Sequence, residues 1–265
     1  MKFSFKHLLL GCILLYLPGQ TMAWGLLGHR IVGEVADCYI KGKTRKEVKK
    51  ILGNESLAMA SNWADFVKSD STFKYLDNWH YANFMDNLDF QMLKEAMEKE
   101  TGTNIQNRIV FLSTELKNRD LDQAKKQMYL RLLIHLVGDL HQPMHMGRQD
   151  DLGGNRIKLY WFNQPTNLHR LWDSDMIESM QLSYTEYAAA VNYPNRTQLK
   201  AWLHDDLNVW AFESYQLSRT LYSSVQPEQK LSYRYNYDHI ASLDHQLMKG
   251  GVRLAGLLNR VFAGY

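Results

Sequence analysis

Apolar residues recur at intervals of three and four along most of the chain, which is the spacing of an amphipathic helix. The segment 121–140 places Met128, Leu132 and Leu136 on one side, and Pro143 is expected to end or kink the helix there. We expect this segment to form the longest helix of the fold. The same periodicity predicts further helices at 90–99, 105–116, 199–221 and 240–262.

Local signals predict two shorter features. Thr44 and Glu47 are spaced as a capping box, which predicts a helix that starts at Thr44 and stops at Gly53. Residues 151–155 are expected to form a loop or tight turn, and alternating apolar residues at 156–162 predict a small β-hairpin arm. The chain contains five prolines and no internal repeat. We therefore predict an all-α fold to which the arm is a minor addition.

The N-terminal residues have the pattern of an export signal. Basic residues precede an apolar run, 8–17, which is too short to span a bilayer and is typical of a signal peptide. We expect cleavage between Ala23 and Trp24, which leaves 24–265 as a single domain. The mature protein is then expected to be secreted or periplasmic, with no stable membrane anchor. The alternative is lipidation of Cys12, although Cys12 lies in the middle of the apolar run rather than at its end.

Composition narrows the function classes. The net charge falls from +3 to +1 when the two lysines of the signal are removed, so the chain lacks the basic surface of a typical nucleic-acid-binding domain. Cys38 is the one cysteine left after cleavage, and therefore no intrachain disulfide can form. We expect bound metal to supply stability in addition to the core.

Histidine and aspartate recur at spacings that suit metal ligands. His135 and Asp139 are four residues apart, as are His169 and Asp173, so each pair shares one face of a helix. His145 follows six residues after Asp139. Imidazole and carboxylate together suit zinc, although each pair alone is more commonly an ion pair or a hydrogen-bonded core histidine. The remaining candidates lie upstream and are Trp24, His29, Asp65 and His80.

Cleavage before Trp24 would add one more kind of ligand. The freed α-amino group and the carbonyl oxygen of Trp24, together with His29, could chelate one metal ion. The amine must be unprotonated to bind, and its ordinary pKa is about 7.7–8, so acid is expected to expel this ion. A non-catalytic zinc-binding export protein is one alternative, but purely structural zinc sites are usually closed.

Taken together, the motifs resemble those of the single-strand-specific zinc nucleases (nuclease S-one and nuclease P-one type), within the wider zinc-dependent phospholipase C superfamily. The resemblance implies a compact all-α fold and no protein partner. It also implies hydrolysis of single-stranded DNA and RNA, and of mononucleotides with a 3′-phosphate, to 5′-phosphorylated products. The motifs that carry it are Trp24 with His29, Trp63-Ala-Asp65, Trp79-His80, His135-x3-Asp139-x5-His145 and His169-x3-Asp173.

The resemblance further implies three zinc ions in each chain. Asp139 would bridge two of them, and a hydroxide between these two would attack phosphorus in line. The third ion would stabilise the leaving 3′ oxygen. The catalytic residues implied are Asp65, Asp139 and Lys68. The ligand sets implied are Asp65, His80, His135 and Asp139 for one ion, Trp24, His29 and Asp139 for a second, and His145, His169 and Asp173 for the third.

Four residues are implied as substrate contacts. Lys68 would meet the phosphate, at a position where the family often has arginine. Tyr81 would stack on a base. Asn83 takes a place where some members of the family have an acid, and Asn155 would line the cleft. A plain surface, core or turn role is the alternative for each of the four.

A zinc-dependent phospholipase C acting on phospholipid headgroups is the alternative activity. That branch of the superfamily tends to have glutamate at the position of Asp173, and the nuclease branch has aspartate, so Asp173 favours the nuclease. The histidines without a place in the family pattern are expected to be structural or surface groups; they are His141, His204, His239 and His245.

Overall fold

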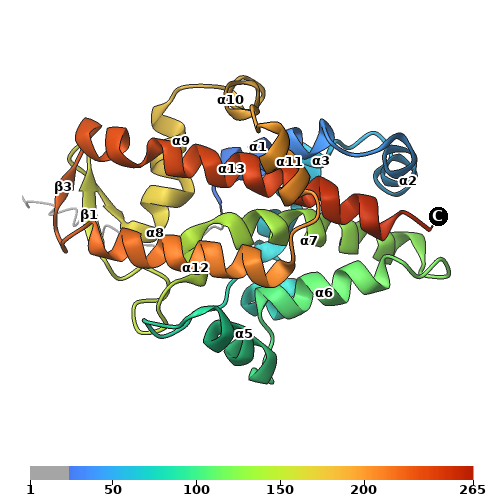
Figure 1. The fold of residues 1–265 in the computed structure, drawn as a ribbon, viewed down its shortest axis with the longest axis horizontal. Helices are drawn as coiled ribbons and strands as arrows, with labels where there is room; N and C mark the ends of the chain where they lie inside the picture. Colours follow the sequence, from blue (N-terminus) through green and yellow to red (C-terminus); the bar gives the residue numbers. More distant parts are fainter. Residues whose placement is uncertain (1–23, 265) are drawn as a thin grey trace, which may run out of the picture.

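The computed structural model describes residues 24–264, so the predicted signal peptide lies outside the described residues. Helices dominate the fold (Figure 1), and among those described none is long and apolar enough to cross a membrane. The longer helices are α1 (Leu26–Asp37), α2 (Gly42–Leu52), α5 (Phe90–Lys99), α6 (Ile105–Glu115), α7 (Gln123–His141), α10 (Tyr184–Val191), α11 (Arg196–Trp202), α12 (Leu207–Ser223) and α13 (Tyr233–Val261). The short segments are α3 (Leu57–Ala60), α4 (Trp63–Phe66), η1 (Val67–Ser69), η2 (Ser71–Trp79), η3 (Pro143–Met146), α8 (Leu168–Arg170), η4 (Leu171–Asp175) and α9 (Met176–Ser179).

Helix α7 forms the centre of the fold. It packs against α1, α6, α12 and α13, and Figure 1 shows it between α13 and α6. From Ile134 to His141 every residue of α7 is buried. Polar side chains on this part of the helix are therefore removed from water, and they require hydrogen-bond or metal partners in the core.

The prediction of an all-α fold is confirmed, and the central helix lies close to its predicted range. Helix α7 ends two residues before Pro143, which is the first residue of η3. The expectation that α7 is the longest helix is wrong, because α13 has 29 residues. Helix α13 begins seven residues before the predicted start at 240, since its first turns are largely exposed and carry little apolar periodicity.

Two helix boundaries differ from the prediction, and both differences concern the helix caps. Helix α2 begins at Gly42 without a side-chain cap, and Thr44 lies buried inside the helix, so the predicted capping box does not form. Gly53 ends this helix as predicted, with φ of 69°. The range 199–221 contains two helices rather than one, because the side chain of Asp206 accepts a hydrogen bond from a backbone N–H and starts α12.

The predicted arm is present but extends further than predicted. Strand β1 (Lys158–Trp161) lies within 156–162, whereas its antiparallel partner β2 (Gln164–Asn167) follows that range. A third strand, β3 (Lys230–Leu231), joins β1 in parallel and was not predicted. The turn before the arm is confirmed, with φ of 64° at Gly153 and 83° at Gly154. These positive φ values favour glycine, and the turn brings the Gly153 carbonyl to the candidate site.

Candidate metal centre

The predicted ligands come from separate elements that converge on the buried part of α7. Helix α1 carries His29, α4 carries Asp65, and His80 follows η2. Buried imidazoles and carboxylates are costly unless they are paired or bind metal. All of the predicted side-chain ligands are buried: His29, Asp65, His80, His135, Asp139, His145, His169 and Asp173.

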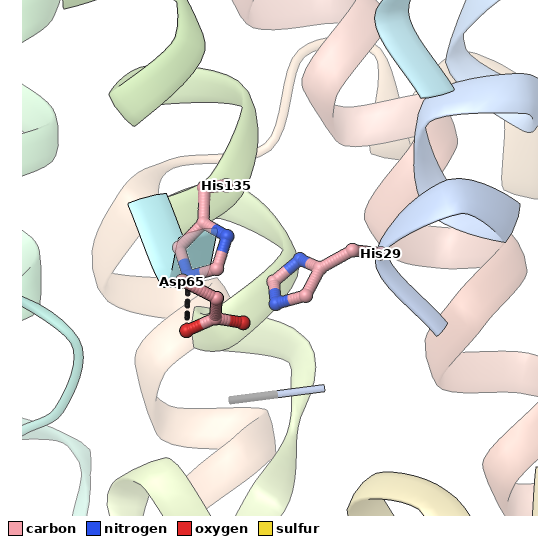
Figure 2. A group of neighbouring side chains, drawn as sticks. All are labelled: His29, Asp65 and His135. Atoms are coloured by element: carbon pink, nitrogen blue, oxygen red, sulfur yellow. Dashed lines mark ion pairs between the residues drawn. The ribbon is translucent and has the colours of Figure 1, made fainter. Parts of the chain in front are cut away.

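These side chains form three groups, each with ligand atoms within 4.8 Å of one another. Figure 2 shows the first group, His29, Asp65 and His135, whose side chains project from three different helices toward one point. The two imidazole rings of this group stack with centroids 3.9 Å apart. The second group is His80, His135 and Asp139, and it shares His135 with the first.

The two carboxylate oxygens of Asp139 face different histidines. Oδ1 lies 3.2 Å from Nε2 of His29. Oδ2 lies 2.9 Å from Nδ1 of His80 and 3.2 Å from Nε2 of His135. Each oxygen of this carboxylate therefore faces a different set of nitrogen ligands. A carboxylate that bridges two cations requires this arrangement.

The third group contains His145, His169 and Asp173. The i, i+4 pair lies as predicted, with Nε2 of His169 3.1 Å from Oδ2 of Asp173. Nδ1 of His169 donates to the Gly153 carbonyl at 2.7 Å, and Nδ1 of His145 donates to the His80 carbonyl at 2.5 Å. These backbone bonds fix each ring so that Nε2 points into the group, because metal-binding histidines commonly donate their other ring N–H to a carbonyl.

Several buried atoms of the three groups make no well-directed hydrogen bond among the described residues, although some lie 3.1–3.2 Å from another ligand atom. Leaving a buried polar atom unpaired costs about 1–3 kcal/mol. A cluster of such atoms therefore indicates that a ligand binds there. Nitrogen and oxygen donors in this mixture fit zinc. The atoms are both ring nitrogens of His29, Oδ2 of Asp65, Nε2 of His80, Oδ1 of Asp139, Nε2 of His145 and Nε2 of His169.

Burial sets the protonation state of most of the histidines. Loss of hydration lowers the pKa of His80 to about 4 and also lowers the pKa values of His29 and His145. All three imidazoles are therefore neutral at neutral pH. The neutral ring is the form that binds metal, so these side chains are ready to act as ligands.

At several ligands the charges inside the site outweigh the effect of burial on the pKa, as Asp139 and His135 show. Burial alone would raise the pKa of Asp139, but the histidines around it, His135 first, outweigh burial and hold that pKa well below its usual value. Burial alone would lower the pKa of His135, but Asp139 and Asp65 outweigh it and raise that pKa. The carboxylates thus attract positive charge to this point, and a bound cation would replace the proton of His135.

Trp24 is fully buried beside the site. Its indole N–H donates to the Gly138 carbonyl at 2.6 Å, and the N–H of Gly25 donates to the Asp173 carbonyl at 2.8 Å. A Cβ at Gly138 would lie 2.8 Å from Nδ1 of His29, so the glycine permits this close approach. The chain around Trp24 is therefore held against the helix that carries Asp139.

A cleft with a volume of about 370 Å³ opens beside the third group. All four of the predicted substrate contacts line it together with three of the histidines: Lys68, Tyr81, Asn83, Asn155, His80, His145 and His169. Nζ of Lys68 lies 2.5 Å from Oδ1 of Asp65. Oδ1 of Asn83 is buried without a hydrogen-bond partner in the part of the chain that the structure describes, while Nδ2 of Asn155 donates to the Leu152 carbonyl at 2.8 Å.

Two supporting residues were not found from the sequence. Gln142 is fully buried, donates from Nε2 to Oδ1 of Asp173 and accepts the N–H of Met144. The sequence offered one signal for Gln142, because it lies between the predicted ligands Asp139 and His145 and directly precedes Pro143. Ser61 accepts from Nδ1 of His135 at 2.6 Å through its backbone carbonyl, which no sequence pattern reveals. Within residues 24–264, the four histidines expected to be structural lie outside the three groups.

Comparison with known proteins assigns the family. A family model described as S1/P1 Nuclease matches residues 24–263. Endonuclease 3 of Arabidopsis thaliana is 30% identical over 95% of this chain and 93% of its own length, and Nuclease P1 of Penicillium citrinum is 27% identical over 90% and 97%. The solved Alpha Toxin from Clostridium Absonum aligns with a TM-score of 0.45 and 17% identity, over 91% of this chain and 65% of the toxin. The family match shows that this chain belongs to the S1/P1 nuclease family and is a hydrolytic enzyme acting on phosphodiester bonds.

Proposed function

We propose that the protein is a zinc-dependent nuclease of single-stranded DNA and RNA that also removes the phosphate of 3′-mononucleotides. Its products are nucleotides that carry a 5′-phosphate. The observation that carries the proposal is the set of three buried His/Asp groups beside one open cleft. We further propose that the enzyme acts after export as a single domain that starts at Trp24.

Three zinc ions fit the donors that the chain provides. The ions, when bound, supply activated water near neutral pH and positive charge at the phosphate. Three Zn²⁺ with three aspartates leave a charge of about +3, which attracts a phosphodiester although the chain as a whole is nearly neutral. The proposed ligands are Asp65, His80, His135 and Asp139 for one ion, Trp24, His29 and Asp139 for a second, and His145, His169 and Asp173 for the third.

Lys68 is proposed to hold the phosphate. Its ammonium group lies against Asp65 and its side chain is 17% exposed at the wall of the cleft. The Asp65 carboxylate restrains the flexible lysine stem, so the charge is placed before substrate arrives. An ammonium group binds a phosphate oxygen as a point charge, without the two-pronged geometry of arginine.

Two side chains of the cleft support a preference for single strands. Tyr81 is 40% exposed and offers a ring on which a base can stack. Asn83 offers an unpaired amide oxygen that can accept a hydrogen bond from a base amine. A base can reach both groups when it has left the stack of a duplex, and bases in a single strand do so at low cost.

The family match favours this activity over a zinc-dependent phospholipase C. Asp173 agrees, because the resemblance associates aspartate at this position with the nuclease branch and glutamate with the phospholipase branch. Hydrolysis of a phospholipid headgroup is therefore the competing activity.

The test is nucleotide release from a single-stranded DNA oligomer by zinc-loaded protein that begins at Trp24. We expect 5′-mononucleotides, faster release than from the matching duplex, loss of activity with a chelator and recovery with zinc. His169→Ala should abolish release, whereas His204→Ala changes an exposed histidine outside the three groups and should not. An intact oligomer, or products with 3′-phosphates, would refute the proposal.

A further inference from the structure

A second cleft lies on the other side of Asp65. Its volume is about 470 Å³, and Asp65, Met59, Asn62, Trp63 and Phe66 are part of its wall. The first cleft is lined by Lys68, whose ammonium group pairs with Asp65 at 2.5 Å. The two clefts therefore meet at the ion pair that is proposed to hold the phosphate.

The outer wall of the second cleft is apolar and open to solvent. Phe66 is 79% exposed, Met59 is 47% exposed and Leu26 is 44% exposed. A cluster of solvent-exposed large apolar side chains beside an active site indicates a ligand-binding surface. A flat ring and a thioether suit the face of a nucleic-acid base, which stacks on such side chains with little regard to sequence.

The inner wall carries unpaired polar atoms. Asn62 is only 8% exposed, and its Oδ1 has no hydrogen-bond partner among residues 24–264, although its Nδ2 donates to the Leu26 carbonyl at 3.3 Å. Nε of Arg30 is likewise buried without a partner in that range. One free acceptor and one free donor match the edge of a base, which offers both kinds of group, whereas an acyl chain offers neither.

We propose that the second cleft binds the nucleoside on the 5′-oxygen side of the scissile phosphate. This inference rests on the proposed nuclease activity. The nucleoside that leaves through its 3′ oxygen then lies in the first cleft beside the third metal group, and the phosphate lies between the two clefts at Lys68. Phe66 and Met59 stack on the second base, and Asn62 and Arg30 contact its edge. The enzyme thereby recognises two consecutive nucleosides of a strand.

Two substrates that differ in the second nucleoside test this proposal. A deoxydinucleotide fills both clefts, whereas the corresponding nucleoside 3′-(methyl phosphate) has a methyl group in place of the second nucleoside. Cleavage at the 3′ oxygen releases the same nucleoside from both. We expect Phe66→Ala to lower the ratio of kcat/KM for the dinucleotide to that for the methyl ester by about tenfold. Tyr193→Ala removes an equally exposed ring (78% exposed) that lines neither cleft, and it should leave the ratio unchanged.

The outcomes separate this proposal from the one on which it rests. If the wild-type protein cleaves both diesters and Phe66→Ala leaves the ratio unchanged, or lowers both rates equally, the second cleft does not bind the nucleoside. If Phe66→Ala instead impairs only the hydrolysis of phosphatidylcholine vesicles, the cleft belongs to a lipid and the proposal is wrong. If the wild-type protein cleaves neither diester, the proposed function itself has failed.

Discussion

Replacing Gly138 with alanine tests how closely the backbone of α7 approaches the metal centre. The added Cβ would lie 2.8 Å from Nδ1 and 3.2 Å from Cε1 of His29, and ordinary contact begins at 3.4 Å. The imidazole must therefore move by about 0.6 Å. The His29 ring cannot move by this distance without displacing its neighbours, because it is fully buried and stacks on His135 with a centroid distance of 3.9 Å.

The fold and the metal site should respond to this change by different amounts. Alanine favours the helix over glycine by about 1 kcal/mol, and overpacking costs about 1–3 kcal/mol. The free energy of unfolding of the metal-free protein should therefore fall by no more than about 2 kcal/mol, which leaves the protein folded. Metal–ligand distances tolerate about 0.2 Å, so the zinc ion at His29 should be lost. Activity should fall by about 10–100-fold, because a misplacement of about 1 Å can cost about 100-fold.

Zinc content and kcat on single-stranded DNA measure both effects in one preparation. We expect Gly138→Ala to bind one zinc ion fewer than the wild type. Gly42→Ala is the matched control, because its Cβ meets no described atom within 4 Å at the exposed start of α2, and it should keep all zinc and activity. A Gly138→Ala variant with the full zinc content and full activity would refute the proposed role of His29.

Four further changes have defined outcomes. Lys68→Ala should lower kcat by about 100-fold in steady-state assays, and Lys68→Arg should recover much of this activity. Full activity of Lys68→Ala would exclude the phosphate contact. One extra residue before Trp24 should reduce both zinc content and activity, and an extended protein as active as the mature one would disprove the terminal chelate. Arg253→Met removes a fully buried guanidinium that contacts two acids at 2.6 and 2.8 Å, and urea titration should show a loss of about 3 kcal/mol; a loss below about 1 kcal/mol would contradict this estimate. Burial alone would raise the pKa of Glu213, but Arg253 and Lys249 outweigh it and lower that pKa below its ordinary 4.5. The stabilisation from these ion pairs is therefore complete above about pH 4.5 and is lost as pH falls further. Glu213→Gln should lose less stability in acid than the wild type. An unchanged acid dependence would show that Glu213 does not contribute.

The parts of the fold that follow from local spacing could be predicted. A proline after a long periodic segment located the end of α7, and the four-residue spacing of His135 and Asp139 placed both on one helix face. The start of α13 could not be found, because its first turns are held by a few contacts such as that of Tyr235 with Trp172 rather than by an apolar stripe. The helical segments at Asp65 and next to His80 were not predicted, because a four-residue helix and a 3-10 helix show no α-helical periodicity in the sequence.

The candidate site was predictable as a list of residues, but its geometry was not. The motifs named the side chains that the structure brings together, because the resemblance of the motifs to a known family links positions far apart in sequence. Nothing in the spacing indicates that the rings of His29 and His135 stack, since this depends on how α1 packs on α7. The second cleft was also missed, because its walls at Met59 and Phe66 come from short helical turns and carry no motif.

The proposed function requires that this chain holds three zinc ions and that Asp139 joins two of them. Diffraction from crystals of the zinc-loaded mature protein, recorded on both sides of the zinc absorption edge, tests it most directly. We expect three anomalous peaks, one beside each carboxylate oxygen of Asp139 and one among His145, His169 and Asp173. A single peak at Asp139, or none, would show that Asp139 does not join two zinc ions.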